Sequence, residues 1–131
     1  MPSVFSKIIS GEIPCAKVWE NDEFLAFLDV MPVAPGHTLV IPKKEENYLF
    51  DLNPEAYGRL MLASRDVARG LKEATGCARV CVGVFGFEVP HVHVHLLPLN
   101  SLSQFPFPSE RAKAAPADLE AVAAKIRLTL K

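Results

Sequence analysis

The stretch that most restricts the fold is residues 91–97, HVHVHLL, in which three histidines alternate with apolar side chains. On a β-strand, residues two apart point to the same face, with their Cα atoms about 6.6 Å apart. His91, His93 and His95 would therefore share one face, while the apolar residues between them pack against a core on the other. The pattern predicts a half-buried strand whose open face carries three imidazoles.

Four further segments are rich in β-forming residues and are predicted to be strands. The turn residues Asn21 and Asp22 separate the first two, which indicates a hairpin. In chain order, the predicted strands are residues 16–20, 23–30, 37–43, 79–89 and 91–97.

Two helices complete the predicted fold. The longer one begins after Asn53, a favourable N-cap, with Pro54 in its first turn and Gly76 able to end it. A second segment, residues 117–130, has its apolar side chains on one helical face and predicts a terminal helix. Strands in hairpins with a long helix and a terminal helix indicate a single antiparallel α+β domain over residues 1–131.

The overall composition restricts the class of function. A formal net charge of -1 gives no bulk attraction to nucleic acid or to an anionic membrane, so neither is expected as a partner. Residues 1–14 do not read as a signal peptide, and no apolar run approaches the roughly 20 residues of a membrane span. Three cysteines without disulfide-framework spacing favour a reducing compartment, so we expect a cytoplasmic protein.

The histidine cluster has three readings at this point. It could be an incidental polar strand face. Two histidines at this spacing could instead chelate a divalent metal, with further ligands from elsewhere in the chain. In the third reading, one imidazole is a nucleophile and its neighbours supply protons or donors to a developing oxyanion.

Beyond the cluster, the chain resembles the histidine triad (HIT) family, in particular its Hint-like branch. HVHVHLLP is similar to the family's His-x-His-x-His signature, and FSKIISGEIP (5–14) and FLDVMPVAPGHTLVIPK (27–43) are similar to its upstream blocks. The resemblance covers about residues 3–98, so the remainder, with its predicted helix, is a C-terminal extension. It implies a five-stranded antiparallel HIT fold, a homodimer whose sheets join across a two-fold axis, and no cofactor.

The resemblance also implies release of a nucleoside 5′-monophosphate from purine nucleoside phosphoramidates or phosphoanhydrides, by hydrolysis or transfer. His93, as the middle histidine, would attack the α-phosphorus and form a nucleotidyl-imidazole intermediate. His95 would donate to the phosphoryl oxygens, where charge develops in the transition state. His91 would hold the site together by hydrogen bonds, and His37 would support the triad from behind.

The nucleoside-binding residues are also carried over from the resemblance. Asp29 matches an acidic residue that accepts hydrogen bonds from ribose hydroxyls, although an aspartate at a strand end can equally form a turn. The apolar positions matching the nucleobase wall would otherwise be assigned to the core. They are Phe5, Ile8, Ile13, Phe27 and Val30.

The chain departs from the family pattern where many bacterial relatives bind a structural zinc ion. Those relatives carry a C-x-x-C pair near the N-terminus and a histidine shortly after the VIPK block. Here the positions hold Ser3, Ser6 and Glu45. Two hydroxyls and one carboxylate make a poor tetrahedral zinc site, so we predict no structural zinc and no other metal.

A second departure precedes the triad, where the usual G-Q-S/T-V is replaced by residues 86–89, GFEV. This is similar to a G-[L/F]-E-V-P-H pattern of a bacterial subgroup. An ionised Glu88 beside a phosphate is repulsive, and we expect it to restrain hydrolysis at the nucleotide site. A nucleotide-binding regulator with weak catalysis and a metal-dependent hydrolase therefore stay as alternatives.

In the segment after the triad, Phe105 and Phe107 could cover the site or pack at a dimer surface.

Overall fold

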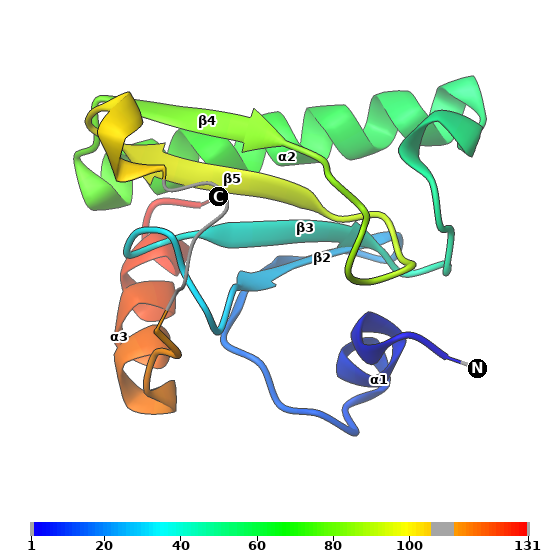
Figure 1. The fold of residues 1–131 in the computed structure, drawn as a ribbon, viewed down its shortest axis with the longest axis horizontal. Helices are drawn as coiled ribbons and strands as arrows, with labels where there is room; N and C mark the ends of the chain where they lie inside the picture. The colour runs from blue at the N-terminus through cyan, green and yellow to red at the C-terminus, as the bar shows by residue number, and fades with distance from the viewer. Residues whose placement is uncertain (1, 106–111, 131) are drawn as a thin grey trace.

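The structure is a computed structural model that describes residues 2–105 and 112–130. Within these residues, one antiparallel sheet has the strand order β1-β2-β3-β5-β4 (Figure 1). Its strands are β1 (Lys17–Glu20), β2 (Phe24–Leu28), β3 (Thr38–Pro42), β4 (Arg79–Gly83) and β5 (Val94–Leu99). The helices are α1 (Val4–Ser10), α2 (Pro54–Thr75) and α3 (Pro116–Arg127), with single 3₁₀ turns η1 (Leu49–Asp51) and η2 (Leu102–Gln104). The expected α+β architecture is confirmed.

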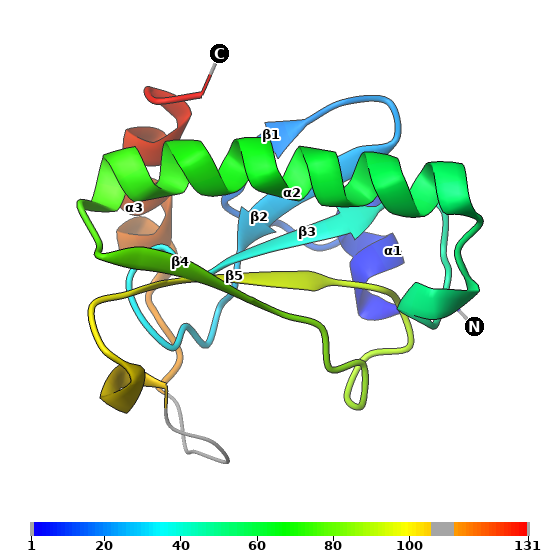
Figure 2. The same ribbon diagram turned by 90° about the horizontal axis from the view of Figure 1, so that it is seen from above.

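The two faces of the sheet bury different clusters because neighbouring residues on a strand point opposite ways. On one face, Val40 and Val94 join the main core beneath α2. On the other face, Phe27 and Leu39 pack against Phe5 of α1. Figure 2 shows α2 crossing the strands on one side of the sheet while α1 lies on the opposite side.

The helix signals of the sequence are confirmed in detail for α2. The side-chain oxygen of Asn53 accepts a hydrogen bond from the backbone N–H of Ala56 at 2.8 Å, and Gly76 ends the helix at φ 67°. Helix α3 packs against β1 and α2 and buries Leu119, Ala123 and Ile126. Figure 1 shows it near the C-terminal end of α2. No helix in the described part of the chain is long and apolar enough to cross a membrane.

All five predicted strands extend beyond those of the structure, and two of the differences lie beside the triad. Strand β4 ends at Gly83 instead of residue 89, and β5 begins at Val94 instead of His91. Pro90 has no N–H for a ladder, and the N–H groups that follow it bond outside the sheet. His91 donates to the carbonyl of Val89 at 2.8 Å, and the next residue donates to the Glu46 carbonyl. The triad therefore begins in a loop and ends in a strand.

Helix α1 was missed by the sequence reading. Its signals are nevertheless present: the Ser3 side chain accepts from the backbone N–H of Ser6 at 3.0 Å, and Gly11 closes the helix in the left-handed region at φ 88°. The seven residues between these caps are too few for a clear amphipathic period. The helix is central to the site, because it carries Ser3 and Phe5 to the face of the sheet where the histidines lie.

Candidate active site

His91 is fully buried and is bonded at both ring nitrogens. Its Nε2 lies 2.7 Å from the carbonyl oxygen of Pro42 at the end of β3, and its Nδ1 lies 2.8 Å from Oγ of Ser3. A carbonyl oxygen only accepts, so Nε2 carries the proton and the serine hydroxyl donates to Nδ1 of the neutral ring. Burial lowers the pKa of His91, which favours that neutral form.

His93 is buried and takes its orientation from the backbone of His91. Its Nδ1 lies 2.7 Å from the His91 carbonyl oxygen, so Nδ1 is the protonated nitrogen that donates. In the neutral ring the lone pair is then on Nε2. The Phe5 ring meets the His93 ring edge-on, and the His95 ring lies on another side, each with a centroid separation of 4.9 Å.

His95 belongs to β5 and is held by His37 from the start of β3. The backbone N–H of Val33 donates to Nδ1 of His37 at 3.0 Å, so Nε2 of His37 carries the proton. That Nε2 lies 2.9 Å from Nδ1 of His95 and donates to it. Gly36, at φ 94°, makes the turn that aims His37 inward, and a Cβ there would lie 3.1 Å from side chains of α2.

Asp29, directly after β2, is both a turn residue and a neighbour of His37. Its Oδ1 accepts the backbone N–H of Met31 at 2.8 Å, and its Oδ2 lies 3.6 Å from Nε2 of His37. The two readings of this aspartate from the sequence are therefore compatible, since one oxygen makes the turn and the other faces the histidines.

The predicted nucleobase wall is brought together only in part. Phe5, Ile8 and Phe27 belong to the apolar cluster between α1 and the sheet. Ile13 is half-buried in the turn after α1, and Val30 is exposed beyond β2. Neither belongs to that cluster in the described part of the chain.

Glu88 is exposed on the loop between β4 and the triad, together with Phe87. From the same loop, the ring of Phe85 contacts His95 with a centroid separation of 5.3 Å. Phe105 stacks on Phe85 at 6.4 Å. The segment after β5 thus reaches the histidines through Phe85, while Phe107 lies outside the described residues.

Comparisons with known proteins agree with this geometry. The HIT domain profile matches residues 10–102. An uncharacterised HIT-like protein of Mycobacterium tuberculosis is 40% identical over 104 residues, covering 75% of this chain and 72% of that protein. The adenosine 5′-monophosphoramidase of Schizosaccharomyces pombe is 33% identical over 99 residues, covering 75% and 74%.

The chain belongs to the HIT family. A crystal structure of a HIT-like protein from Bartonella henselae, described as involved in cell-cycle regulation and holding an unknown ligand, superposes with a TM-score of 0.86. That protein is 35% identical, and the match covers 98% of this chain and 96% of the other. HIT proteins are generally nucleotide hydrolases or transferases, and membership of the family supports this general class of activity.

This HIT protein has hydrogen bonds where many bacterial relatives have zinc ligands. Oε1 of Glu45 accepts from the backbone N–H of Ser3 at 2.7 Å and from the hydroxyl of Ser6 at 2.6 Å. These two bonds lower the pKa of Glu45 from 4.5 to about 2, and the bond from the Ser6 hydroxyl has the larger effect. Oγ of Ser3 in turn donates to His91. Hard oxygen donors already engaged with one another do not fit a structural zinc ion.

A second group has potential metal ligands. Single ligand atoms of Asp29, His37 and His95 lie within 4.8 Å of one another. The Val33 N–H, however, occupies the Nδ1 lone pair of His37, and the proton on Nε2 then leaves that ring without a free lone pair for a metal. The donor set fits a relay of hydrogen bonds better than a metal centre.

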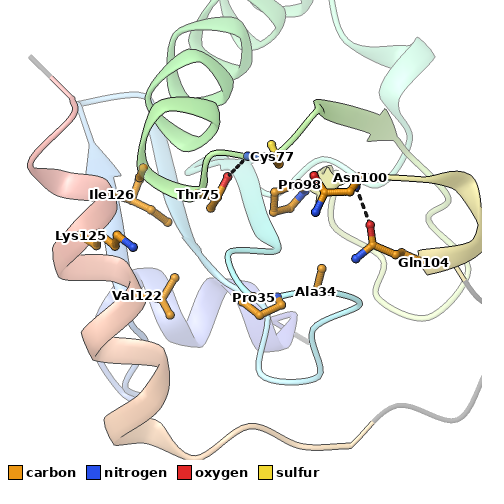
Figure 3. A pocket seen from close by; sticks show the side chains of 11 residues that line it. Ala34, Pro35, Thr75, Cys77, Pro98, Asn100, Gln104, Val122, Lys125 and Ile126 are labelled. Atoms are coloured by element: carbon orange, nitrogen blue, oxygen red, sulfur yellow. Dashed lines mark hydrogen bonds between the residues drawn. The ribbon is translucent and has the colours of Figure 1, made fainter.

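The HIT domain also has an open pocket of about 270 Å³ at the other end of the sheet (Figure 3). It lies between the C-terminal end of α2, α3 and the loop before β3. None of the histidines lines it. Two of its polar side chains already have partners, because Thr75 donates to the Leu71 carbonyl and Asn100 accepts from Ala78. Chemistry is therefore expected at the histidines.

Proposed function

We propose that this HIT protein releases a nucleoside 5′-monophosphate from purine nucleoside phosphoramidates or phosphoanhydrides, as a hydrolase or nucleotidyl transferase. Membership of the family and the similarity to an adenosine 5′-monophosphoramidase support a reaction at a nucleotide phosphate. The observation that carries the proposal is the hydrogen bond from Nδ1 of His93 to the His91 carbonyl, because it leaves the Nε2 lone pair for attack.

The reaction has two steps in this proposal. First, Nε2 of His93 attacks the α-phosphorus, a P–N bond to the imidazole forms, and the bond to the amine or phosphate leaving group breaks. The leaving amine takes up a proton as it departs. Then water attacks the phosphorus, the bond to His93 breaks, and the monophosphate and a proton are released. A second nucleophile in place of water gives transfer.

The remaining histidines stabilise charge and geometry in this scheme. Because His37 donates to Nδ1 of His95, the neutral His95 ring carries its proton on Nε2 and can donate to a phosphoryl oxygen. The ring of His95 lies 4.9 Å from that of His93, close enough to serve the same phosphate. Each imidazole thus has a role that matches its hydrogen-bond partner.

The nucleoside would lie against the α1 face of the sheet. Asp29 supplies the carboxylate for the ribose hydroxyls, and Phe5, Ile8 and Phe27 supply the apolar wall. Ile13 and Val30 would join this wall only when a ligand brings them to it. Glu88, exposed on the loop before the triad, would face the phosphate side of the ligand and moderate turnover.

We also propose that the protein acts as a homodimer, joined through β4. This strand is at the edge of the sheet, and its Val82 side chain is 56% exposed. Among the described residues no strand pairs with the outer side of β4, and an edge strand with an apolar side chain is a common site of pairing between chains. Light scattering should give twice the chain mass for the wild type and the chain mass for Val82→Lys.

The enzyme proposal is tested by mixing the protein with a fluorogenic AMP amidate and searching for the covalent product. A burst of leaving group, together with AMP attached to His93 in a peptide map, is expected. AMP binding without a burst or adduct would favour the regulatory alternative. Activity that disappears with a chelator and returns with a divalent metal would favour the metal-dependent alternative.

A further inference from the structure

A connected set of hydrogen bonds joins the N-terminal segment to the middle of the triad. It runs from the exposed carboxylate of Glu45 to the backbone N–H of Ser3, from the Ser3 hydroxyl to His91, and from the His91 carbonyl to the ring of His93. The residues come from three segments that are far apart in sequence, and Figure 1 shows α1 beneath the sheet at the end where the triad begins.

The Ser3 side chain has two structural roles. Its side-chain oxygen accepts the N–H of Ser6 and thereby caps α1, while its hydroxyl proton is directed at Nδ1 of His91. The alternative acceptor for that proton, Oγ of Ser6, is farther away at 3.4 Å. Ser3 is itself buried, so its orientation is set by these partners and not by solvent. The helix cap and the histidine contact therefore depend on the same side chain.

His91 has little freedom within this arrangement. Its ring spans from Ser3 to the Pro42 carbonyl, and the Phe5 ring closes one side with a centroid separation of 5.8 Å. A hydroxyl that donates to Nδ1 and a carbonyl that accepts from Nε2 together select one neutral tautomer and one ring orientation. The titratable groups that influence this ring are Glu45 and the neighbouring His93.

The orientation of His91 matters because its carbonyl sets the tautomer of His93. Residues 91–93 precede the regular part of β5, so no ladder on the sheet fixes that carbonyl. It is held instead by the ring contacts of His91 and by the bond from the Val92 N–H to the Glu46 carbonyl at 2.7 Å. A shift of the His91 backbone would release Nδ1 of His93 and allow the tautomer without a lone pair on Nε2.

We propose that Ser3, anchored by Glu45, is a positioning residue that fixes His91 and through it keeps Nε2 of His93 available as the nucleophile. This inference rests on the proposed function of His93. It assigns the N-terminal cap of α1 to the chemistry of the site, where the sequence alone shows only a missing zinc ligand.

Three variants separate the positioning role from the helix cap. Ser3→Gly removes the hydroxyl but keeps most of the capping free energy, since glycine is tolerated at N-caps. Ser3→Thr keeps both the cap and the hydroxyl donor. Ser10→Ala is the matched control on the same helix, because Ser10 is exposed and its hydroxyl bonds locally, donating to the Lys7 carbonyl and accepting from the Glu12 N–H.

The variants are compared by burst kinetics with the AMP amidate and by ¹⁵N NMR of the histidine rings without substrate. For Ser3→Gly we expect the burst rate to fall by about 10- to 100-fold with KM little changed, because the nucleophile is misplaced while the nucleotide contacts remain. The His93 ring should change from the Nδ1–H form to a mixture of tautomers. Ser3→Thr should restore both properties, and Ser10→Ala should match the wild type.

A folded Ser3→Gly variant with the wild-type burst rate and wild-type His93 tautomer would overturn the inference. A lower burst rate with an unchanged His93 tautomer would also overturn it, because the lower rate would then reflect lost stability and not a misplaced nucleophile. Should Ser3→Gly not fold, Glu45→Ala weakens the same anchor from the exposed side and must shift the tautomer in the same direction. The NMR result does not need turnover, so it decides the role of Ser3 even if the wild type forms no nucleotidyl adduct.

Discussion

Nδ1 of His93 lies 2.7 Å from the carbonyl oxygen of His91, two residues earlier in the same motif. The protonation pattern of the proposed nucleophile is therefore set by a backbone acceptor and not by an acidic side chain. A backbone carbonyl does not titrate, so the proton on Nδ1 is retained across the pH range in which the ring is neutral. The spacing of the histidines supplies both the nucleophile and the acceptor that orients it.

Replacing His93 should abolish covalent catalysis while leaving nucleotide binding. For His93→Ala we expect a loss of turnover of about 1,000-fold or more, because the attacking nitrogen is removed and water alone is a poor substitute. Peptide mapping should find no nucleotidyl adduct. Isothermal titration should still detect AMP. An adduct on another residue of the folded variant would contradict the assignment of His93.

Runs of β-forming residues between turn signals were sufficient to predict four of the strands, and β2 and β3 are in fact buried on both faces. Alternation of histidines with apolar residues predicted the fifth. It could not predict where β5 begins. His91 and His93 continue the alternation, yet the backbone N–H of His91 bonds to Val89 in the preceding turn and that of Val92 bonds to Glu46 after β3. The Glu46 partner is distant in sequence, and no local pattern encodes it.

The candidate site shows the same division. The triad was visible from its spacing and His37 from the resemblance, but the groups that hold His91 and His37 were not: Ser3 and Pro42 for His91, and Val33 for His37. In the sequence, Ser3 is distinguished only as a departure from a metal-binding pattern. Its contact with a histidine 88 positions away depends on how α1 packs against the sheet.

Removing metals should leave the activity unchanged. Of the possible ligands, His37 has its Nδ1 occupied by the Val33 N–H and its Nε2 directed at His95, so the reaction proposed here needs no Lewis acid. Turnover of the AMP amidate is expected to be equal before and after exhaustive treatment with EDTA, which is then removed by dialysis. A loss that is reversed by added zinc or manganese would speak for a metal-dependent enzyme.

The contribution of Glu45 to stability should depend on pH in a defined window. Hydrogen bonds from the Ser6 hydroxyl and the Ser3 N–H lower its pKa from 4.5 to about 2, so the carboxylate stabilises the folded state above pH 4.5. That contribution is lost as the pH falls through 4.5 toward 2, because the unfolded chain takes up the proton first. Urea denaturation should find Glu45→Gln less stable than the wild type at pH 7, with the gap closing toward pH 3.

The control for this experiment is Glu12→Gln, which removes another exposed carboxylate outside the Ser3–Glu45 contacts. It should show no comparable change in the gap. A difference between Glu45→Gln and the wild type that is the same at pH 7 and pH 3 would exclude the carboxylate as the source.

Removing the charge of Glu88 should increase turnover. The side chain is exposed on the loop before the triad, and a carboxylate within about 8 Å of a phosphate repels it at physiological ionic strength. For Glu88→Ser we expect release of the monophosphate to accelerate by about 2- to 10-fold. Glu73→Ser, an exposed carboxylate on α2, serves as the control for net charge. Unchanged or slower turnover in Glu88→Ser would count against a restraining role.

The hydrogen-bonded group of Ser3, Ser6, Glu45 and His91 should become a zinc site when its oxygen donors are replaced. The two serine hydroxyls lie 3.4 Å apart, and Oγ of Ser3 lies 2.8 Å from Nδ1 of His91. Ligands of a tetrahedral zinc ion are about 3.6 Å from one another, so a small relaxation of α1 suffices. The Ser3→Cys, Ser6→Cys, Glu45→His triple variant then offers two thiolates and two imidazoles.

We expect one zinc ion per chain in the triple variant by atomic absorption, a higher Tm with zinc than with EDTA, and no bound zinc in the wild type. Because Nδ1 of His91 would now bind the metal, its Nε2 would still donate to Pro42, and the His93 tautomer should be preserved. A triple variant that binds no zinc although it is folded would mean that these four positions do not converge as the structure has them.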